Sequence, residues 1–219
     1  MRSQRFKVVV FDMDGTLVEE SSCWETLHKY FGANPQLVRK NMKDYLAGRI
    51  NYCEWMRRDL LLWKRDNKLP HISEIKAVLK NYKIVKGAYK TVQELKKRGY
   101  ITAIVTSGLD ILAKEVAEKL NIDYTYANSF ETDENGYLTE KVNCEVKLLE
   151  KDKNLKDLSK KLKIPLSAFI AVGDTWFDLS MLQVAGLSIA FNPKDEKIRK
   201  KVNIVIENKN LTEILKYIP

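Results

Sequence analysis

The chain has 219 residues, 45% of them hydrophobic, so it is long enough and apolar enough to bury a core of its own. Its net charge is +9, but 31% of the residues are charged and acids are interspersed among the lysines, which favours a solvated mixed surface over a nucleic-acid-binding face. No apolar run approaches the roughly 20 residues of a membrane span and no signal-peptide pattern precedes the first apolar segment, so we expect a soluble, cytoplasmic protein without a membrane partner.

Short apolar runs alternate with helical patterns along most of the chain. The apolar runs predict buried strands at Lys7–Phe11, Ile101–Val105, Ala168–Val172, Leu187–Phe191 and Ile204–Ile206. Helical periodicity predicts helices at Ala88–Arg98, Leu109–Leu120, Asn154–Leu162 and Phe177–Val184. The alternation indicates βαβ units and hence an α/β fold, a doubly wound, mostly parallel, Rossmann-like sheet that binds ligands at the carboxyl ends of its strands.

Two segments interrupt this alternation. From Ser21 to Asn81 the sequence shows helical periodicity and no strand signal, which predicts a helical cap inserted after the first strand. Between residues 124 and 142 the pattern alternates around Asn135-Gly136, a strong hairpin signal. We therefore expect two parts, a core and a helical cap: the core comprises residues 1–17 and 87–219, with a β-hairpin at about 124–143, and the cap comprises residues 18–86.

The three cysteines are Cys23, Cys53 and Cys144. They lie far apart and show no CxxC spacing, so the sequence predicts neither a disulfide framework nor a zinc cluster. We expect reduced thiols.

The first predicted strand ends in the stretch FDMDGT, where Asp12 and Asp14 stand two residues apart. In an extended chain their side chains point to the same face, ~6–7 Å apart, and Gly15 lets the chain turn away. A calcium loop of the EF-hand type is excluded: counted from Asp12, Gly15 is fourth and Cys23 twelfth, whereas such a loop needs glycine at the sixth position and glutamate at the twelfth. A turn capped by two aspartates is the remaining alternative.

The second core strand leads into the stretch TSGLD. Thr106, Ser107 and Gly108 then lie between a strand end and a helix start, where hydroxyls and free backbone N–H groups can hold an anion such as phosphate. The alternative is an ordinary N-cap, in which a hydroxyl satisfies the first amides of the helix.

The third core strand leads into GDTWFD, and Asp178 lies near Asp174 if this segment turns helical. As alternatives, Asp174 is a helix cap, and Trp176 and Phe177 are core aromatics. Lys151, at the start of the preceding helix, either lends a positive charge to these acids or is one more solvated lysine.

All of these polar clusters fall at strand ends or helix starts of one sheet. Carboxylate ligands for a hard cation such as Mg²⁺, a carboxylate nucleophile, an anion-binding loop and a lysine are the groups that phosphoryl transfer requires. The sequence therefore predicts this chemistry at the carboxyl edge of the sheet.

This set of motifs resembles the haloacid dehalogenase superfamily of aspartate-nucleophile phosphatases, and within it the phosphoserine-phosphatase-like branch. The matching stretches, in chain order, are DMDGT at 12–16, Thr106 with Ser107 and Gly108, a lysine before the last strand–helix units, and GDTWFD at 173–178. The resemblance covers nearly the whole chain, including the predicted cap and hairpin.

The resemblance implies different tasks for the paired acids. Asp12 is then the nucleophile that takes the phosphoryl group as an aspartyl phosphate, and it is also a Mg²⁺ ligand. Asp14 ligates Mg²⁺ through its backbone carbonyl, and its side chain protonates the leaving oxygen and later activates water. The metal and Lys151 should lower the pKa of Asp12, which leaves Asp14 the easier of the two to protonate.

The resemblance also assigns the remaining motif residues. Thr106 and the backbone amide of Ser107 hold the phosphoryl oxygens. Lys151 neutralises charge that develops on the nucleophile and on the phosphoryl group. Asp174 is the second carboxylate ligand of Mg²⁺, and Asp178 supports the waters of the metal or the lysine.

The chain departs from the resemblance where the substrate would be recognised. Phosphoserine phosphatases place an acid at the Ser21 position for the substrate amino group, an arginine at the Asp59 position for its carboxylate, and an asparagine at the Phe177 position near the phosphate. Neighbouring side chains could take over, although one residue along a helix turns a side chain by about 100°; these neighbours are Glu19, Glu20, Arg57 and Arg58.

The predicted function is a Mg²⁺-dependent phosphomonoester hydrolase that acts on a small phosphorylated metabolite through an aspartyl-phosphate intermediate, under a cap that excludes water. One alternative is a specific phosphoserine phosphatase. An alternative of another class is a basic module that binds nucleic acid on the same fold without catalysis, against which the intact set of candidate catalytic residues argues. Three tryptophans either line an apolar pocket or pack within the cap: Trp24, Trp55 and Trp63.

Overall fold

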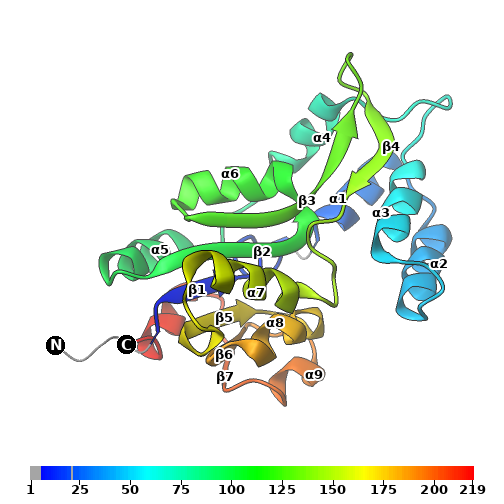
Figure 1. The fold of residues 1–219 in the computed structure, drawn as a ribbon. Coiled ribbons are helices and arrows are strands. Elements are labelled where there is room, and N and C mark those ends of the chain that lie inside the picture. Colours follow the sequence, from blue (N-terminus) through cyan, green and yellow to red (C-terminus); the bar gives the residue numbers. More distant parts are fainter. Residues whose placement is uncertain (1–5, 21) are drawn as a thin grey trace.

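The structure is a computed structural model that describes residues 6–20 and 22–219 (Figure 1). Its strands are β1 (Val8–Phe11), β2 (Ile101–Leu109), β3 (Tyr124–Thr132), β4 (Leu138–Asn143), β5 (Phe169–Gly173), β6 (Leu187–Phe191) and β7 (Ile204–Ile206). Its α-helices are α1 (Cys23–Phe31), α2 (Pro35–Leu46), α3 (Tyr52–Leu61), α4 (Ile72–Leu79), α5 (Ala88–Lys97), α6 (Asp110–Leu120), α7 (Lys151–Leu162), α8 (Leu179–Val184) and α9 (Glu196–Arg199). The short 3₁₀ helices are η1 (Leu166–Ala168), η2 (Trp176–Asp178) and η3 (Leu211–Lys216). No helix in the described residues is long and apolar enough to cross a membrane.

The described strands form one sheet in the order β4-β3-β2-β1-β5-β6-β7. All neighbouring strands are parallel except β3 and β4, which pair antiparallel as a hairpin. The chain builds outward from β1 to one side through β2 and β3, and then to the other side through β5, β6 and β7. The strand order therefore reverses between β1 and β5, the point at which sheets of this kind bind ligands. The predicted α/β class and the mostly parallel sheet are confirmed.

The sequence of β1 is continuously apolar because both of its faces are buried. Val8 and Val10 belong to the core cluster that packs under α7, α8 and α9. Val9 and Phe11 point to the other face and join the cluster that includes α5, α6 and the helices inserted after β1. Successive strand residues alternate between faces, so each layer of helices receives every second side chain. The end of β1 is held between these two packed layers.

The helices α1 to α4 are inserted between β1 and α5. The segments that leave and re-enter the core run side by side: Val18 and Ile84 form an antiparallel bridge, and the N–H of Val85 donates to the carbonyl of Leu17 at 2.9 Å. Figure 1 shows α2 and α3 at the end of the sheet where β1 and β5 terminate. The division into a core and a cap of residues 18–86 stays a prediction, which this chain path supports.

Three predicted elements differ from the structure by more than one residue at an end or by a break. Strand β2 continues beyond Val105 to Leu109, with a register shift between those two residues, because the polar stretch TSG stays extended although its apolar pattern has ended. Helix α7 begins at Lys151, before the first apolar position of its periodic pattern. The last predicted helix is divided into η2 and α8.

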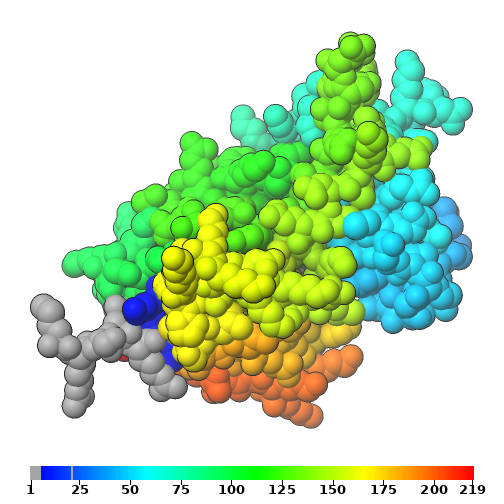
Figure 2. All heavy atoms as spheres, in the orientation of Figure 1, coloured from blue at the N-terminus to red at the C-terminus, as the bar shows by residue number. Residues whose placement is uncertain are grey.

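Cys53 and Cys144 form a disulfide, so the prediction of reduced thiols is wrong for this pair. Cys53 lies in α3 and Cys144 follows β4, with their Cα atoms 5.7 Å apart and a sequence separation of 91. In the space-filling view (Figure 2), the cyan helical segment near residue 50 packs against the yellow-green segment near residue 145. Spacing rules missed the pair because the contact is tertiary. Cys23 is a free, buried thiol, as predicted.

Candidate active site

A cavity of about 860 Å³ lies between the carboxyl edge of the sheet and the inserted helices. The structure brings most of the predicted site residues to this cavity: Asp12, Asp14, Thr106, Ser107, Lys151 and Asp174 line it. Asp178 is fully buried and contacts Lys151. The opposite wall comes from α1, α2 and α3.

A buried lysine lies between two carboxylates at the end of β1. Lys151 is 2% exposed, and its Nζ donates to Asp12 Oδ1 and to Asp178 Oδ1, both at 2.7 Å. Asp12 follows β1, Lys151 begins α7 and Asp178 ends η2, so three segments that are distant in sequence meet here. The interpretation of Lys151 as a solvated surface lysine is wrong.

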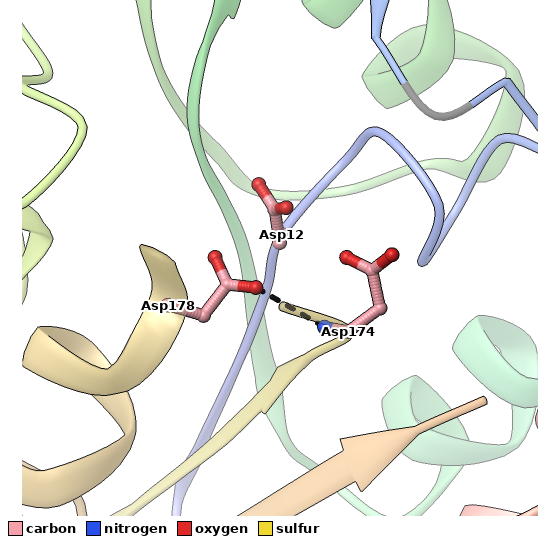
Figure 3. Close-up of side chains that lie close together, drawn as sticks. All are labelled: Asp12, Asp174 and Asp178. Atoms are coloured by element: carbon pink, nitrogen blue, oxygen red, sulfur yellow. Dashed lines mark hydrogen bonds between the residues drawn. The ribbon is translucent and has the colours of Figure 1, made fainter. Parts of the chain in front are cut away.

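Asp174 joins this group from the end of β5. Its N–H and that of Thr175 both donate to Asp178 Oδ2 at 3.1 Å. Figure 3 shows the carboxylates of Asp12, Asp174 and Asp178 on the same side of the strand ends. The capping box at the start of η2 is formed by Thr175 and Asp178, so the interpretation of Asp174 as the helix cap is wrong.

Gly15 is required where the loop after β1 passes close to Asp174. Its φ of +78° is in the left-handed region, and a Cβ at this position would lie 2.1 Å from Asp174 Oδ2. The glycine of the DMDGT stretch thus allows both the turn and the approach of the two acidic loops.

Three carboxylates share one ammonium group in this cluster, and their pKa values reflect the surplus of negative charge. Burial and the Asp178 carboxylate raise the pKa of Asp12 to about 7, although Lys151 opposes the shift. Burial, together with Asp178 and Asp12, raises the pKa of Asp174 to about 9. Burial lowers the pKa of Lys151, but the carboxylates of Asp12 and Asp178 outweigh it and hold this pKa above its usual value. An additional cation would relieve the carboxylate repulsion.

Asp14 reaches the cavity from the loop after β1. Its Oδ2 accepts the N–H of Cys23 at 3.2 Å, so the first turn of α1 orients the side chain. Burial raises the pKa of Asp14 to about 6, although the Cys23 N–H opposes the shift. Asp14 therefore accepts the first N–H of α1, whose N-cap is Ser22, and it also faces the cavity. Burial thus raises the pKa of both acids, and the order predicted with Mg²⁺ bound stays a prediction.

Thr106, Ser107 and Gly108 form the irregular end of β2. Thr106 is 1% exposed, and its Oγ1 accepts the N–H of Gly108 at 2.9 Å, which leaves the hydroxyl hydrogen available to donate. The N-cap of α6 is Leu109, whose side chain forms no capping bond. The interpretation of the threonine and serine as the N-cap of this helix is therefore wrong.

Asn128 is a structural residue of the site that the sequence analysis missed. It is fully buried in β3, and its Nδ2 donates to the carbonyls of Ser107 and Val146, both at 2.9 Å. The N–H of Val146 donates back to Asn128 Oδ1 at 2.8 Å. The carbonyl of Ser107 also accepts Tyr52 Oη at 3.1 Å and Trp24 Nε1 at 3.3 Å. An asparagine within a strand belongs to no motif, and its role depends on residues that only the fold brings near.

The acidic cluster fits a hard cation. Asp12, Asp174 and Asp178 each offer a carboxylate oxygen within 4.8 Å of the others. Both oxygens of Asp178 are occupied by Lys151 and by backbone N–H groups. Oδ1 of Asp174 and Oδ1 of Asp14 are buried and have no hydrogen-bond partner among the described residues. Buried carboxylate oxygens without partners, in an all-oxygen set with surplus negative charge, suit Mg²⁺.

The substitutes considered for the missing amine-binding acid do not reach the cavity. Both carboxylate oxygens of Glu20 accept the N–H of Lys83, at 3.2 Å each, and the N–H of Glu19 donates to the carbonyl of the same lysine at 2.9 Å. Neither glutamate lines the cavity. Ser21 lies outside the described residues.

The arginines of α3 are engaged elsewhere. Arg57 Nε lies 3.0 Å from Glu54 Oε2, and its Nη1 lies 2.8 Å from Glu140 Oε2 in β4. Arg58 pairs with Glu54 at 2.8 Å and with Asp44 of α2 at 3.5 Å. Neither arginine lines the cavity.

Trp176 and Phe177 lie at the surface of the site rather than in the core. Both are partly exposed, their rings are 4.2 Å apart, and Phe177 lines the cavity. The interpretation as core aromatics is wrong.

A family model described as haloacid dehalogenase-like hydrolase matches residues 6–186, a range that contains every predicted site residue. The chain belongs to this hydrolase family. Membership confirms the prediction of a haloacid dehalogenase-like hydrolase, and a binding module without catalysis is not supported.

The relatives of this hydrolase are phosphatases. The phosphoserine phosphatase of Methanocaldococcus jannaschii is 37% identical over 213 residues, which is 97% of each chain. A solved phospho-aspartyl intermediate analogue of phosphoserine phosphatase is 34% identical, with a TM-score of 0.82, over 99% of this chain and 100% of that one. A solved substrate-bound phosphoserine phosphatase complex is 35% identical with the same TM-score and coverage. The prediction of a phosphatase in the phosphoserine-phosphatase-like branch is confirmed.

Proposed function

We propose that this hydrolase is a Mg²⁺-dependent phosphomonoesterase that forms an aspartyl phosphate on Asp12. The observation that carries the proposal is the position of the Asp12 carboxylate, which lines the cavity and is held at 2.7 Å by the buried Lys151. One of the solved relatives is a phospho-aspartyl intermediate analogue of phosphoserine phosphatase, which supports the same covalent step here.

In the first half of the reaction, a carboxylate oxygen of Asp12 attacks phosphorus, and the bond between phosphorus and the ester oxygen breaks. The side chain of Asp14 transfers its proton to that oxygen, so the alcohol leaves as a neutral molecule. Burial favours this role because it raises the pKa of Asp14 to about 6, where a carboxyl group can carry a proton near neutral pH.

In the second half, the Asp14 carboxylate takes a proton from water, and the water oxygen attacks phosphorus. The bond between phosphorus and Asp12 then breaks, inorganic phosphate leaves, and the Asp12 carboxylate is restored. Asp14 ends protonated, as it began, so protons and bonds balance over the cycle.

The other residues position these groups. The Thr106 hydroxyl and the Ser107 N–H hold the phosphoryl oxygens, at the loop that Asn128 fixes from below. Lys151 balances the charge that moves between Asp12 and the phosphoryl group. Asp178 accepts hydrogen bonds from Lys151 and from the backbone N–H of Asp174. It therefore positions these two residues and does not itself contact the substrate.

The carboxylates of Asp12 and Asp174 and the backbone carbonyl of Asp14 would hold Mg²⁺. When bound, the cation supplies positive charge that polarises the phosphoryl group. We also propose that the inserted helices, residues 18–86, serve as the cap that excludes water from the reaction.

The substrate is a small phosphorylated metabolite, and phosphoserine is one candidate. The names of the relatives favour it, because the Methanocaldococcus jannaschii enzyme is a phosphoserine phosphatase that aligns with this chain over nearly its full length.

Phosphate release from 4-nitrophenyl phosphate tests the proposed function. The wild-type protein should turn over with Mg²⁺ and stop with chelator, and Asp12→Asn should reduce kcat on the order of 10⁴-fold or more. Asp157→Asn, an exposed acid on α7, is the matched control and should behave as wild type. Acid-quenched wild-type protein should carry a phosphoryl group on the peptide that contains Asp12. Activity retained in Asp12→Asn contradicts the nucleophile assignment.

A further inference from the structure

The part of the cavity that faces the reacting groups is aromatic and apolar. Trp24 comes from α1, Met42 from α2, and Tyr52 and Trp55 from α3. The volume of about 860 Å³ falls in the range of ~300–1,000 Å³ that small-molecule pockets occupy. The phosphoryl group fills only the end nearest the sheet, so the alcohol part of the substrate must contact this wall.

Asp59 is a buried acid in that wall. It lies on α3, is 4% exposed and lines the cavity. Its Oδ1 accepts Asn41 Nδ2 of α2 at 2.8 Å, and its Oδ2 lies 3.3 Å from His28 Nε2 of α1. The carboxylate therefore joins three inserted helices at the side of the cavity.

The histidine partner of Asp59 is neutral. Trp63 Nε1 lies 3.0 Å from His28 Nδ1, and an indole nitrogen can only donate. Nδ1 of His28 must accept this bond, so it carries no hydrogen and the ring is the neutral tautomer protonated on Nε2. His28 then donates to Asp59 without bringing a positive charge.

Other cations near the wall do not neutralise Asp59. Lys29 pairs with Glu25 at 2.9 Å, and both side chains are exposed. Arg39 lines the rim of the cavity but is exposed to solvent, which screens its charge. Within residues 6–20 and 22–219, Asp59 forms no ion pair with a lysine or an arginine. A buried carboxylate whose partners are all neutral donors is left with uncompensated charge.

We propose that Asp59 recognises an ammonium group on the alcohol part of the substrate, so that the enzyme acts on phosphate esters of amino alcohols. This inference rests on the proposed function. A substrate ammonium supplies the positive charge that Asp59 lacks, and the aromatic wall attracts a primary or a quaternary ammonium through cation–π contacts. Phosphoserine belongs to this class through its amino group. Its carboxylate is of like charge to Asp59, so esters without a carboxylate should be the better substrates.

Pairs of esters that differ only in charge test the proposal. Choline phosphate and 3,3-dimethylbutyl phosphate have the same shape, and only the first is cationic; ethanolamine phosphate and propyl phosphate form a second pair. For each pair we expect kcat/KM on the order of 10-fold higher for the cationic ester. Equal or lower values for the cationic esters overturn the proposal.

The variant Asp59→Asn keeps the shape of the side chain and removes its charge. The ratio of kcat/KM between the cationic and the neutral ester should fall toward one. A purely structural role for Asp59 would lower both values equally and leave the ratio unchanged, and that result contradicts the proposal. The control is Asp44→Asn: Asp44 is a buried acid on α2 that pairs with Lys40 and Arg49 and does not line the cavity, so the ratio should stay as in wild type.

Binding to Asp12→Asn separates this inference from the proposed function. If the wild type does not hydrolyse 4-nitrophenyl phosphate, the proposed phosphomonoesterase fails. Calorimetry with Asp12→Asn still decides the ammonium site: tighter binding of choline phosphate than of 3,3-dimethylbutyl phosphate supports it, and equal binding overturns it.

Discussion

The carboxyl edge of the sheet and the wall of inserted helices line the same cavity, but they compensate charge in opposite ways. At the sheet edge, Lys151 binds Asp12 and Asp178 at 2.7 Å each, so the edge carries its own cation. In the wall, the side-chain partners of Asp59 among the described residues are the neutral donors of Asn41 and His28. The edge therefore carries the charges that phosphoryl transfer needs. In the wall, the negative charge of Asp59 is compensated when a cationic substrate binds.

The two regions are also positioned by different parts of the structure. Phe11 of β1 lies opposite Val172 of β5 in a parallel register, so backbone pairing places the loops that carry Asp12 and Asp174 side by side. The wall depends on the rotation of α3, which turns Asp59 into the cavity and Arg57 away from it. A rotation of this kind is set by side-chain partners and not by backbone pairing.

Replacing Lys151 by methionine should have the largest effect. The variant leaves Asp12 and Asp178 buried without a counter-ion, which costs about 3–5 kcal/mol of unfolding free energy. It also removes the charge that stabilises phosphoryl transfer, so kcat should fall on the order of 10²–10³-fold for cationic and neutral esters alike. Urea unfolding and steady-state kinetics measure both. A loss confined to cationic esters would assign Lys151 to the substrate wall instead.

Removing divalent cations should make stability fall as pH rises. The pKa of Asp12 is raised to about 7 and that of Asp14 to about 6, so the folded protein holds these protons more tightly than the unfolded chain. Their stabilising contribution is complete below the unfolded pKa of 3.8 and is lost as pH rises through these folded values. At about 1.4 kcal/mol per pKa unit, a few kcal/mol should be lost between roughly pH 5 and 8.

Mg²⁺ should reverse this trend, because the cation binds the deprotonated carboxylates and competes with their protons. Thermal unfolding measures this trend, with chelator and with Mg²⁺, at roughly pH 5 and at roughly pH 8. The metal should raise the melting temperature more at the higher pH. Asp174→Asn removes a carboxylate whose pKa is raised to about 9. In the presence of chelator, this variant should therefore show a weaker dependence of stability on pH. Stability that rises with pH in chelator contradicts this account of the sheet edge.

Breaking the disulfide should destabilise the wall without changing the reaction at the edge. The bond links two cysteines at a sequence separation of 91 and joins α3 to the segment after β4, so Cys53→Ser should lower the unfolding free energy by about 2–4 kcal/mol. Dithiothreitol should lower the stability of the wild type by a similar amount and leave Cys53→Ser unchanged. A wild type that is insensitive to reductant would show that the bond does not contribute.

The edge of the sheet was predictable from sequence because its residues follow apolar runs directly. Asp12, Thr106 and Asp174 each stand just after such a run, and parallel strands bring their carboxyl ends together. The local sequence left two readings of Lys151 open, a charge donor or a solvated lysine, and the family resemblance chose the first, since nothing nearby separates it from the other lysines of α7.

The wall was not predictable, because it depends on pairs that the chain brings together only after folding. The partners of Asp59 stand 18 and 31 residues away, on two other helices. The disulfide and the hydrogen bonds of Asn128 likewise join segments without a shared motif. Helical periodicity placed tryptophans on the inserted helices but could not show that Trp24 and Trp55 line the cavity while Trp63 is buried and binds His28.

The variant Arg57→Ala should have the smallest effect and tests whether the wall is fixed. Arg57 is 38% exposed and pairs with Glu54 and Glu140, so its removal should lower the unfolding free energy by less than about 1 kcal/mol. Because its guanidinium points to β4, kcat/KM for phosphoserine should change less than about 2-fold. Lys64→Ala, which removes the other partner of Glu140, is the matched control.

A loss of kcat/KM on the order of 10²-fold for phosphoserine, with ethanolamine phosphate unaffected, would mean that Arg57 leaves Glu140 to bind the substrate carboxylate. The specificity of the wall would then depend on a rearrangement around the substrate. The charge of Asp59 would select the substrate ammonium, and the displaced Arg57 would select its carboxylate.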